Sequence, residues 1–399
     1  MTQAKEYPLG NIFDIARGGS PRPIQKFLTD AADGVNWIMI GDAAEGQKYI
    51  TKTKHRIRSD GVSRSREVFP GDFILSNSMS FGRPYILKTG GCIHDGWLVL
   101  RKKTKEVDED YFYHLLGSPQ VYREFCRRAA GACVKNLNKD LVSSVTVPLP
   151  PLPEQKRIAA ILDKADELRA KRRQAIAKVD ELLQATFNTM FGSCNRPPIS
   201  IGEPTFGDSE SFEELSTVAR LATGHTPDRN RPDYWDGDVP WVSLTDIRRV
   251  DGTTTSATLQ SVTEEGIKHS SAVKLPAGTV CFSRTATVGF VTVMGREMAT
   301  SQDFVNWICS DRIDPIYLMW ALRMARPYLL SKASGSTHKT IYYRDAEQFQ
   351  VLLPPVNLQR TFVAIATSSE VQKARYYRQE TEMNALFASL QQRAFKGEL

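Results

Sequence analysis

The chain repeats one pattern of residues at an interval of about 204 positions, and this repeat limits the folds that it can adopt. The segment Val35-Asn36-Trp37-Ile38 is matched by Val239-Pro240-Trp241-Val242. Tandem arrays of small repeats have periods of about 20 to 50 residues. A much longer period therefore predicts that a whole domain and its connector are duplicated, which suits a chain of 399 residues.

The repeat also indicates how each unit is built. Its middle holds short apolar runs typical of buried strands, such as residues 72–75 and 279–282. Each unit closes on a proline pair, and a long helical pattern follows each pair. We therefore predict an α+β fold with a β-rich core in each unit. The predicted globular domains are residues 1–150 and 193–353, and the predicted helices are residues 151–192 and 354–399.

Apolar residues in the first helical segment recur at alternating steps of three and four, the heptad pattern of paired helices. The predicted contact residues of this helix are Ile158, Ile161, Ala165, Leu168, Ala175, Val179 and Leu182, with Arg172 filling one position. Those of the C-terminal helix are Phe362, Ile365, Tyr376, Met383, Leu386 and Leu390. Because the chain order is domain, helix, domain, helix, a shared seam predicts an antiparallel coiled coil with a pseudo-two-fold axis. The alternative is two unrelated surface helices.

Charge and cysteine content indicate the kind of partner and the compartment. The net charge of +7 and the pI near 9.0 favour a polyanionic partner, either nucleic acid or an anionic membrane surface. The six cysteines lie far apart without a CxxC pair, which argues against a zinc site and fits reduced thiols. The N-terminus does not resemble a signal peptide, and no apolar run has the roughly 18 residues that span a bilayer. We therefore expect a cytoplasmic protein.

Sequence motifs for catalysis and cofactor binding are missing. There is no Gly-rich phosphate loop ending in Lys-Ser or Lys-Thr, no Asn-Pro-Pro-aromatic tetrapeptide and no metal-ligating His or Cys cluster. Asp95 and Asp303 could act as acid or base groups, but stabilisation of a turn is the favoured role of each. We therefore predict a binding protein without cofactor or metal rather than an enzyme.

A basic segment between Lys48 and Arg66 is the first nucleic-acid signal. If Thr51 to Arg58 is extended, its alternate residues share one face and form a stripe suited to phosphates. The residues of this stripe are Lys52, Lys54, Arg56 and Arg58. The alternative is a solvated edge strand, because lysine-rich edges also prevent aggregation.

Loops of both units carry the polar side chains that read base edges. The candidates in the first unit are Arg17, Ser20, Arg22, Asn77, Arg83, Lys135, Asn136 and Asn138. Those in the second are His225, Arg229, Arg231, Tyr234, Arg284, Thr285, His338, Lys339, Tyr342, Tyr343 and Arg344. The loops match in position but differ in residue type, as two different half-sites would require.

The chain resembles the specificity (S) subunits of type I restriction-modification systems along essentially its whole length. The resemblance rests on the segment from Pro148 to Ile158, which leads into the first helix, and on the terminal Ala394-Phe395-Lys396-Gly397-Glu398-Leu399. Residues 263–268 and 334–339 are also similar to the pattern of that family. The second helix departs from it, since Asn357-Leu358-Gln359 replaces the usual Pro/Ser-Glu-Gln.

This resemblance implies two target recognition domains at the ends of an antiparallel helical pair, each reading one half of a split, asymmetric site in double-stranded DNA. It implies that the helices set the spacer and dock two methyltransferase (M) subunits, which bring S-adenosylmethionine and methylate adenine. A restriction/translocase (R) subunit joins for cleavage. The chain itself would then be non-catalytic. The competing readings are a coiled-coil scaffold that does not bind DNA and a stand-alone DNA methyltransferase or nuclease.

Overall fold

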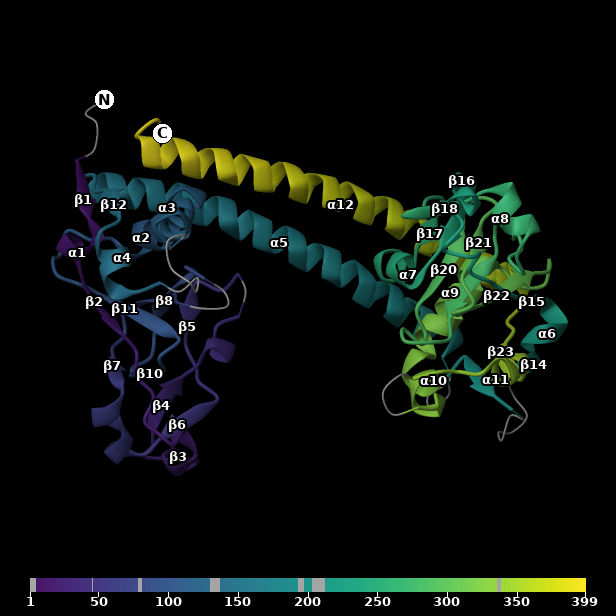
Figure 1. Ribbon diagram of the computed structural model, residues 1–399, viewed down its shortest axis with the longest axis horizontal. Coiled ribbons are helices and arrows are strands. Elements are labelled where there is room, and N and C mark those ends of the chain that lie inside the picture. The colour runs from purple at the N-terminus through teal and green to yellow at the C-terminus, as the bar shows by residue number, and fades with distance from the viewer. Residues whose placement is uncertain are drawn as a thin grey trace. The chain divides into compact units, whose positions relative to one another are not determined.

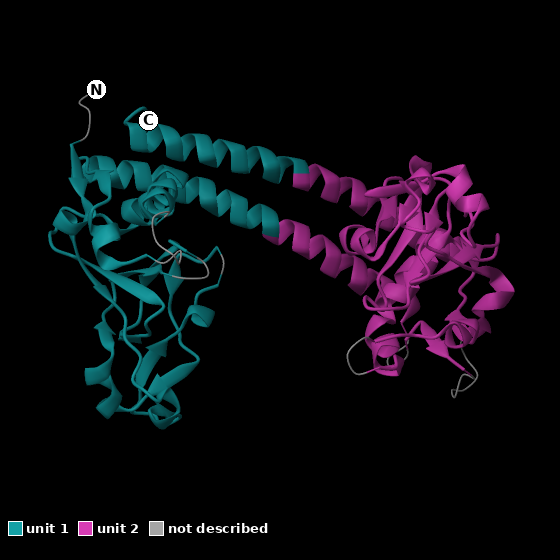
Figure 2. Ribbon diagram, viewed as in Figure 1, with its two compact units in different colours: residues 1–173, 378–399 teal, residues 174–377 magenta. Residues whose placement is uncertain are grey.

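The computed structural model describes residues 5–44, 46–77, 81–129, 137–192, 197–202, 212–335 and 339–399. The chain divides into two compact units (Figure 2). Unit 1 comprises Met1–Arg173 and Arg378–Leu399, and unit 2 comprises Gln174–Tyr377. Each of the two long helices therefore contributes one segment to each unit.

Unit 1 combines strands with short helices ahead of its first long helix (Figure 1). Its strands are β1 (Glu6–Pro8), β2 (Phe13–Arg17), β3 (Leu28–Thr29), β4 (Val35–Ile38), β5 (Tyr49–Ile50), β6 (His55–Ile57), β7 (Arg66–Val68), β8 (Phe73–Ser76), β9 (Pro84–Leu87), β10 (Gly91–Ile93), β11 (Trp97–Lys102) and β12 (Thr146–Pro148). Its short helices are α1 (Leu9–Ile12), η1 (Ile24–Lys26), η2 (Ile40–Asp42), η3 (Ser59–Arg64), α2 (Glu109–Leu116), α3 (Pro119–Ala129) and α4 (Lys139–Ser143). The sheets have the strand orders β3-β6-β4-β10-β7, β2-β11-β8-β9-β5 and β1-β12.

Unit 2 has the same mixture of elements. Its strands are β13 (Ile199–Ile201), β14 (Phe212–Glu214), β15 (Ala219–Thr223), β16 (Trp235–Val242), β17 (Thr254–Thr255), β18 (Gln260–Val262), β19 (Val280–Ser283), β20 (Val291–Met294), β21 (Ala299–Thr300), β22 (Phe304–Cys309) and β23 (Phe349–Leu352). Its short helices are α6 (Leu215–Val218), η4 (Pro232–Tyr234), α7 (Leu244–Val250), α8 (Glu264–Lys268), α9 (Pro315–Met324), α10 (Arg326–Lys332) and α11 (Tyr343–Glu347). The sheets have the orders β15-β22-β19-β20-β17, β18-β16-β21 and β13-β23-β14.

One sheet is built in the same way in both units. The order β2-β11-β8-β9-β5 of unit 1 corresponds to β15-β22-β19-β20-β17 of unit 2, strand for strand. The registers also correspond, because Trp97 lies opposite Ser76 in unit 1 and Phe304 lies opposite Ser283 in unit 2. The predicted α+β fold with a β-rich core in each unit is confirmed, and the sequence repeat has a structural counterpart in this sheet.

The long helices are α5 (Leu152–Phe191) and α12 (Val356–Lys396). Within unit 1, Arg169 Nε on α5 donates to Asn384 Oδ1 on α12 at 2.7 Å, and Arg157 donates to the carbonyl of Leu399 at 2.7 Å. Residue numbers therefore rise along one helix as they fall along the other. Within unit 2, the ring of Phe187 on α5 meets that of Phe362 on α12 at 5.1 Å.

The buried face of α5 includes only some of the residues that the heptad pattern predicted. Ile158 is buried as predicted, but Leu168 and Leu182 are 46% and 67% exposed. The buried residues lie one position further along the chain and include Leu162 and Leu183. The prediction was wrong at Leu182 because the adjacent Leu183 is equally apolar, so spacing alone did not select between them. It was wrong at Leu168 because the half-buried Arg169 packs on Phe387 at this level instead.

Helix α12 shows the same kind of difference. Phe362 is buried as predicted, whereas Ile365 and Leu386 are 40% and 58% exposed and were wrongly predicted as contact residues. Ala366 is buried instead. At Phe387, which is half-buried, the guanidinium of Arg169 lies 4.3 Å from the ring centroid. A cation over an aromatic ring therefore replaces an apolar pair at this level of unit 1.

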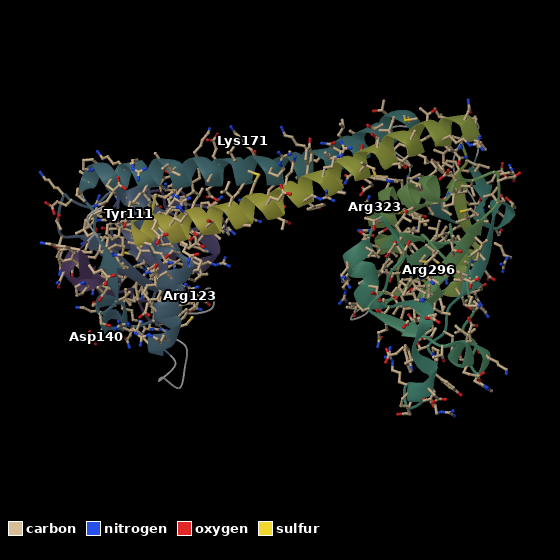
Figure 3. All side chains as sticks on the ribbon, turned by 90° about the horizontal axis from the view of Figure 1, so that it is seen from above. Tyr111, Arg123, Asp140, Lys171, Arg296 and Arg323 are labelled. Atoms are coloured by element: carbon tan, nitrogen blue, oxygen red, sulfur yellow. The ribbon has the colours of Figure 1, made fainter. Side chains whose placement is uncertain are left out.

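Aromatic side chains attach the long helices to the core of each unit. In unit 1, Tyr111 on α2 packs edge-on against Phe395 on α12 with ring centroids 5.7 Å apart. Tyr111 is labelled in Figure 3 close to the C-terminal end of α12. In unit 2, Trp320 on α9 packs against Phe362 at 5.6 Å. Polar contacts add to the attachment in unit 1, where Asp163 on α5 accepts from Lys48 Nζ at 2.7 Å.

A buried glutamine lies at the start of α5. The side chain of Gln155 is fully buried, and its Oε1 accepts the backbone N–H of Asp108 at 2.9 Å. Its Nε2 donates to the carbonyls of Glu106 and Pro150, both at 2.8 Å. The amide thereby satisfies backbone groups of the loop before α2 and of the proline segment that leads into the helix.

Gln359 repeats this arrangement at the start of α12. It is also fully buried, and its Oε1 accepts the N–H of Asp314 at 2.8 Å. Its Nε2 donates to the carbonyls of Arg312 and Pro354 at 3.1 and 2.8 Å. The departure of residues 357–359 from the usual family pattern therefore leaves the amide and its bonds in place.

We predict that Gln155→Ala lowers the free energy of unfolding by about 2 to 4 kcal/mol, because it leaves the buried carbonyl of Pro150 and the partly buried N–H of Asp108 without partners. Urea denaturation followed by tryptophan fluorescence measures this loss. Gln174→Ala, on the exposed side of the same helix, is the matched control and should change stability by less than about 0.5 kcal/mol. Equal losses in the two variants would contradict the assigned role.

Candidate nucleic-acid interface

The basic segment of unit 1 is less extended than predicted. Strand β6 begins only at His55, so Lys52 and Lys54 precede it, and Arg58 lies just before η3. All four residues of the predicted stripe are exposed. Arg58 pairs with Asp60 at 2.8 Å, and Arg56 donates to the carbonyls of Ala31 and Ala32 at 3.3 Å. The positive charges face solvent, but they do not follow one continuous strand.

The edge-strand alternative for this segment is wrong. Strand β6 lies between β3 and β4 in its sheet and is hydrogen-bonded on both sides. Protection of an open sheet edge therefore does not explain the basic residues of this strand.

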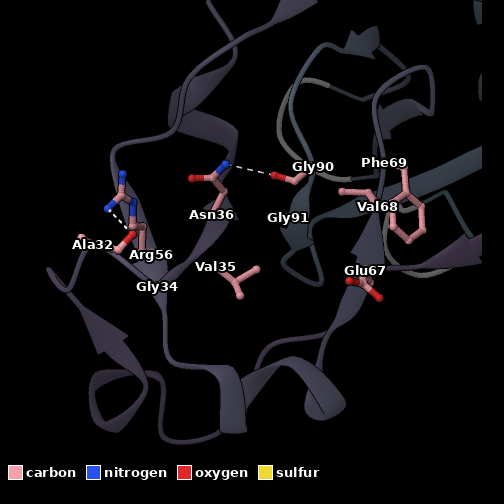
Figure 4. Close-up of a pocket in the computed structure, with 10 residues that line it drawn as sticks. All are labelled: Ala32, Gly34, Val35, Asn36, Arg56, Glu67, Val68, Phe69, Gly90 and Gly91. Carbon is pink, nitrogen blue, oxygen red and sulfur yellow. Dashed lines mark hydrogen bonds between the residues drawn. The ribbon is translucent and has the colours of Figure 1, made fainter.

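A shallow cavity of about 310 Å³ lies beside Arg56 (Figure 4). Its wall includes the carboxylate of Glu67 and the amide of Asn36, whose Nδ2 donates to the carbonyl of Gly90 at 3.0 Å. Among the predicted DNA-reading residues that the structure describes, only Arg56 lines it. This cavity is therefore separate from the cluster formed by the other candidates.

Asp95 is the centre of that cluster in unit 1. It lies in the turn between β10 and β11, two residues before Trp97. Its Oδ1 accepts the hydroxyl of Ser20 at 2.6 Å, and its Oδ2 lies 3.5 Å from the guanidinium of Arg22. Its carbonyl accepts from Arg17 Nε at 3.2 Å and from Asn77 Nδ2 at 2.7 Å. The structure thus brings together the predicted residues Arg17, Ser20, Arg22 and Asn77.

The carboxylate of Asp95 is kept in its charged form. The hydrogen bond from Ser20 lowers the pKa of Asp95 below its ordinary value, against the opposing effect of partial burial. Its neighbour His94 is half-buried, and burial lowers the pKa of this imidazole. The N–H groups of Gly96 and Ile40 point at the ring nitrogens of His94, at 2.8 and 3.2 Å. The neutral ring can accept at only one of these nitrogens, and the shorter distance favours Nδ1. Protonation of the ring would remove this acceptor from the turn that holds Asp95.

Gln302 occupies the equivalent place in unit 2. It lies between β21 and β22, two residues before Phe304. Its Oε1 accepts the hydroxyl of Thr226, and its carbonyl accepts from Arg284 Nε and Nη2 at 3.1 and 2.9 Å. Close to Gln302, the backbone N–H of His225 donates to the carbonyl of Thr300 at 2.9 Å. The cluster of unit 2 therefore contains the predicted residues His225 and Arg284.

Further candidates of unit 2 adjoin Arg284. Thr285 forms a β-bridge with Thr340, and the carbonyl of Lys339 accepts the N–H of Ala286 at 3.1 Å. Tyr342, which is 58% exposed, caps helix α11 and is followed by the half-buried Tyr343 and the exposed Arg344. Burial raises the pKa of Tyr343, so its phenol stays neutral and can donate a hydrogen bond.

The remaining candidates of unit 2 surround η4. The guanidinium of Arg229 lies 4.8 Å from the ring centroid of Trp235. Arg231 pairs with Asp233 at 2.7 Å, and Tyr234 is buried and stacked on His269 at 6.1 Å. The ring of Tyr234 therefore supports its loop from inside, whereas both arginines stay exposed.

Other predicted residues of unit 1 lie outside the Asp95 cluster or outside the described part of the chain. Arg83 is exposed and borders a cavity of about 480 Å³ near Tyr122. Asn138 caps helix α4, accepting the N–H of Leu141 at 2.8 Å. Lys135 and Asn136, and His338 in unit 2, lie outside the described residues.

Sequence reasoning missed the importance of position 302 and assigned Asp95 to turn stabilisation alone. The available signal was position relative to the strands, because each residue stands two places before a buried aromatic, Trp97 or Phe304. Aligning the units on these aromatics, rather than on the fixed interval of the repeat, pairs Asp95 with Gln302. The fixed interval misaligns them because the units differ in loop length before this strand.

The described residues were also compared with what a metal site and a membrane-spanning helix require. Within these residues, no group of three or more His, Cys, Asp or Glu side chains could hold a metal ion. Across the same part of the chain, no helix is both long and apolar enough to cross a membrane. The described cysteines, Cys92, Cys126, Cys281 and Cys309, are free thiols.

We predict that unit 1 loses stability as the pH falls from about 7 to 5. The unfolded chain takes up a proton at His94 near its ordinary pKa of about 6.5, while the folded chain resists it, so acid favours unfolding. Urea midpoints at both pH values measure the effect, and His94→Asn should reduce the difference. His55→Asn, an exposed histidine of the same unit, is the control. Identical pH dependence in wild type and His94→Asn would contradict the prediction.

The chain is similar to known proteins in sequence and in fold. A family model described as the type I restriction modification DNA specificity domain matches residues 1–178 and 209–369. The specificity subunit of type I restriction enzyme MjaIX from Methanocaldococcus jannaschii is 23% identical over 155 residues, which cover 38% of this chain and 36% of that protein. The HindI specificity subunit from Haemophilus influenzae is 29% identical over 32% of this chain and 28% of its own length. The matched segments thus span about a third of these curated relatives.

Longer matches extend over most of the chain. The putative MjaX specificity subunit from Methanocaldococcus jannaschii is 22% identical over 76% of this chain and 72% of its own length. A solved chain from work on complex assembly and conformational transition of the type I R-M system has a TM-score of 0.63 and 17% identity, covering 100% of this chain and 99% of its own. The type I S subunit from M. genitalium has a TM-score of 0.52 and 12% identity over 98% and 96%. At these identities the structures establish a shared fold.

Proposed function

The chain belongs to the family of type I restriction modification DNA specificity domains, and we propose that it is the DNA sequence-specificity subunit of a type I restriction-modification complex. Each unit reads one half of a bipartite, asymmetric DNA site. The observation that carries this proposal is the pair of loop clusters around Asp95 and Gln302. They share one hydrogen-bonded frame and differ in the side chains that the frame presents.

Base reading requires side-chain donors and acceptors held in fixed positions. Hydrogen bonds to the turns at residues 94–96 and 301–303 hold the candidates Arg17 and Arg284 in this way. The predicted base reader Asn77 is only 3% exposed and donates to the carbonyl of Asp95, so it supports the turn instead of facing a base. The exposed basic residues between Lys52 and Arg58 supply charge for phosphate contacts, which strengthen binding without selecting a sequence. We assign residues 1–150 and 193–353 to the two target recognition domains.

The long helices, residues 151–192 and 354–399, form an antiparallel coiled coil with a pseudo-two-fold axis in this proposal. Support comes from contacts within each unit, Arg169 to Asn384 in unit 1 and Lys373 to Asp180 at 2.9 Å in unit 2. Helices of 40 and 41 residues are each about 60 Å long. This length sets the spacer between the half-sites.

Partner subunits supply the chemistry. We propose that two methyltransferase subunits dock along the helices with S-adenosylmethionine, that a restriction/translocase subunit joins them, and that this chain is non-catalytic and works in the cytoplasm. In this proposal the docked subunits cover exposed apolar residues of the helices, namely Leu168 and Leu386 in unit 1 and Leu182 and Ile365 in unit 2.

Exchange of one recognition domain tests the proposal. Residues 8–147 are replaced by the corresponding domain of a relative, and methylated adenines are mapped in DNA treated with the reconstituted complex. One half-site should change completely, while the other half-site and the spacer stay as in wild type. A change in both half-sites, or in neither, would rule out separate reading by the two units.

A paired deletion tests the role of the helices. Removing residues 166–172 from α5 and 381–387 from α12 takes one heptad from each and shortens each helix by about 10 Å, the rise of about three base pairs. The preferred spacer should shorten by about three base pairs, with both half-sites unchanged. Deletion from α5 alone is the control and should destabilise the protein. An unchanged spacer in the paired variant would show that the helices do not set it.

A further inference from the structure

The clusters around Asp95 and Gln302 are equivalent in detail. Each central residue stands two places before the aromatic that begins the next strand. Ser20 lies three residues after Arg17, which is paired with Leu98, and Thr226 lies three residues after Thr223, which is paired with Val305. Strand pairing thus places the donor hydroxyl at the same position of both units.

Two hydrogen bonds recur in both clusters. A hydroxyl, from Ser20 or Thr226, donates to the side-chain oxygen of the central residue. The second bond comes from the residue that follows a buried serine, which is Asn77 in unit 1 and Arg284 in unit 2. Its side chain donates to the backbone carbonyl of the central residue, at 2.7 Å in unit 1 and at 2.9 and 3.1 Å in unit 2. A carboxylate and an amide both offer this side-chain oxygen, so the same frame forms with Asp95 and with Gln302.

Glycine lets the backbone of this frame form in each unit. A Cβ at Gly18 would lie 2.0 Å from the carbonyl oxygen of His94, and one at Gly224 would lie 2.1 Å from Thr300 Oγ1. Backbone hydrogen bonds close the same contact, from Gly19 to Ile93 at 3.1 Å and from His225 to Thr300 at 2.9 Å. Because backbone groups hold these two segments together, the fold does not require one particular side chain at position 95 or 302.

The two central side chains offer different groups to a base. The carboxylate of Asp95 only accepts hydrogen bonds and carries a charge that orients Arg22, whose side chain is 79% exposed. The exposed Gln302 uses its amide oxygen to accept from Thr226, which directs its amide nitrogen as a donor. An arginine can donate to both major-groove acceptors of guanine, and a glutamine amide can match the donor and acceptor of adenine.

We infer that positions 95 and 302 are specificity-determining residues, each setting which base its unit reads within its own half-site. Asp95 acts as a positioning residue for Arg22 and Ser20 that favours guanine, and Gln302 reads adenine directly. The inference rests on the proposed function and narrows it to one side chain in each unit.

The test uses the reconstituted methyltransferase complex with the full-length chain carrying Asp95→Asn or Gln302→Glu. These substitutions keep the shape of the side chain and exchange carboxylate and amide. Methylated adenines are mapped on a library of random DNA sites. Each variant should lower the preference for one base of one half-site about tenfold or more, leaving the other half-site unchanged. Glu106→Gln, a carboxylate-to-amide change on an exposed residue outside the cluster, is the control and should leave both half-sites unchanged.

Thermal melting of each variant separates a purely structural role from a reading role. An unchanged melting temperature with altered base preference in one half-site supports the inference. Wild-type preference in both half-sites, or a uniform loss of methylation on all sites together with lower melting temperature, overturns it. If the wild-type complex itself methylates without sequence preference, the proposed function fails first, and that outcome is distinct from failure of the inference.

Discussion

The buried glutamine at the start of each long helix is the interaction on which the architecture depends. Gln155 and Gln359 each bond a backbone N–H at a helix start of the preceding domain and two carbonyls, one from the proline segment. A buried amide without these partners would be costly, so the bonds fix where each helix leaves its domain. With the helix starts fixed, Phe395 in unit 1 and Phe362 in unit 2 meet their aromatic partners in the domain cores.

The duplicated sheet explains how one fold presents different loop surfaces in unit 1 and unit 2. Strand order and glycine contacts are repeated, and these fix the backbone of the loops around positions 95 and 302. Exposed side chains on those loops do not contribute to the core, so they differ between units without loss of the fold. In the proposed function, this separation of frame and surface lets one fold read two unlike half-sites.

The sequence predicted most of the fold and about half of the cluster. Gly/Pro-rich loops marked Arg17, Ser20 and Arg22, and residues after buried strands marked Asn77 and Arg284, because turn chemistry is local. It did not predict that Asp95 and Gln302 join them, since that follows from strand pairing between distant segments. Nor did it place the helix seam, because Leu182 and Leu183 are equally apolar and only packing buries the second.

The sequence by itself determined the duplication, the α+β units, the two long helices and the positive charge. The duplication follows from segments that match about 204 residues apart, the helices and strands follow from local periodicity, and the charge follows from composition. The tertiary structure decided which helix face is buried, that β6 is an inner strand, and which polar side chains surround Asp95 and Gln302. Those features depend on contacts between residues far apart in the chain, and local pattern carries no information on which of several equivalent residues will meet.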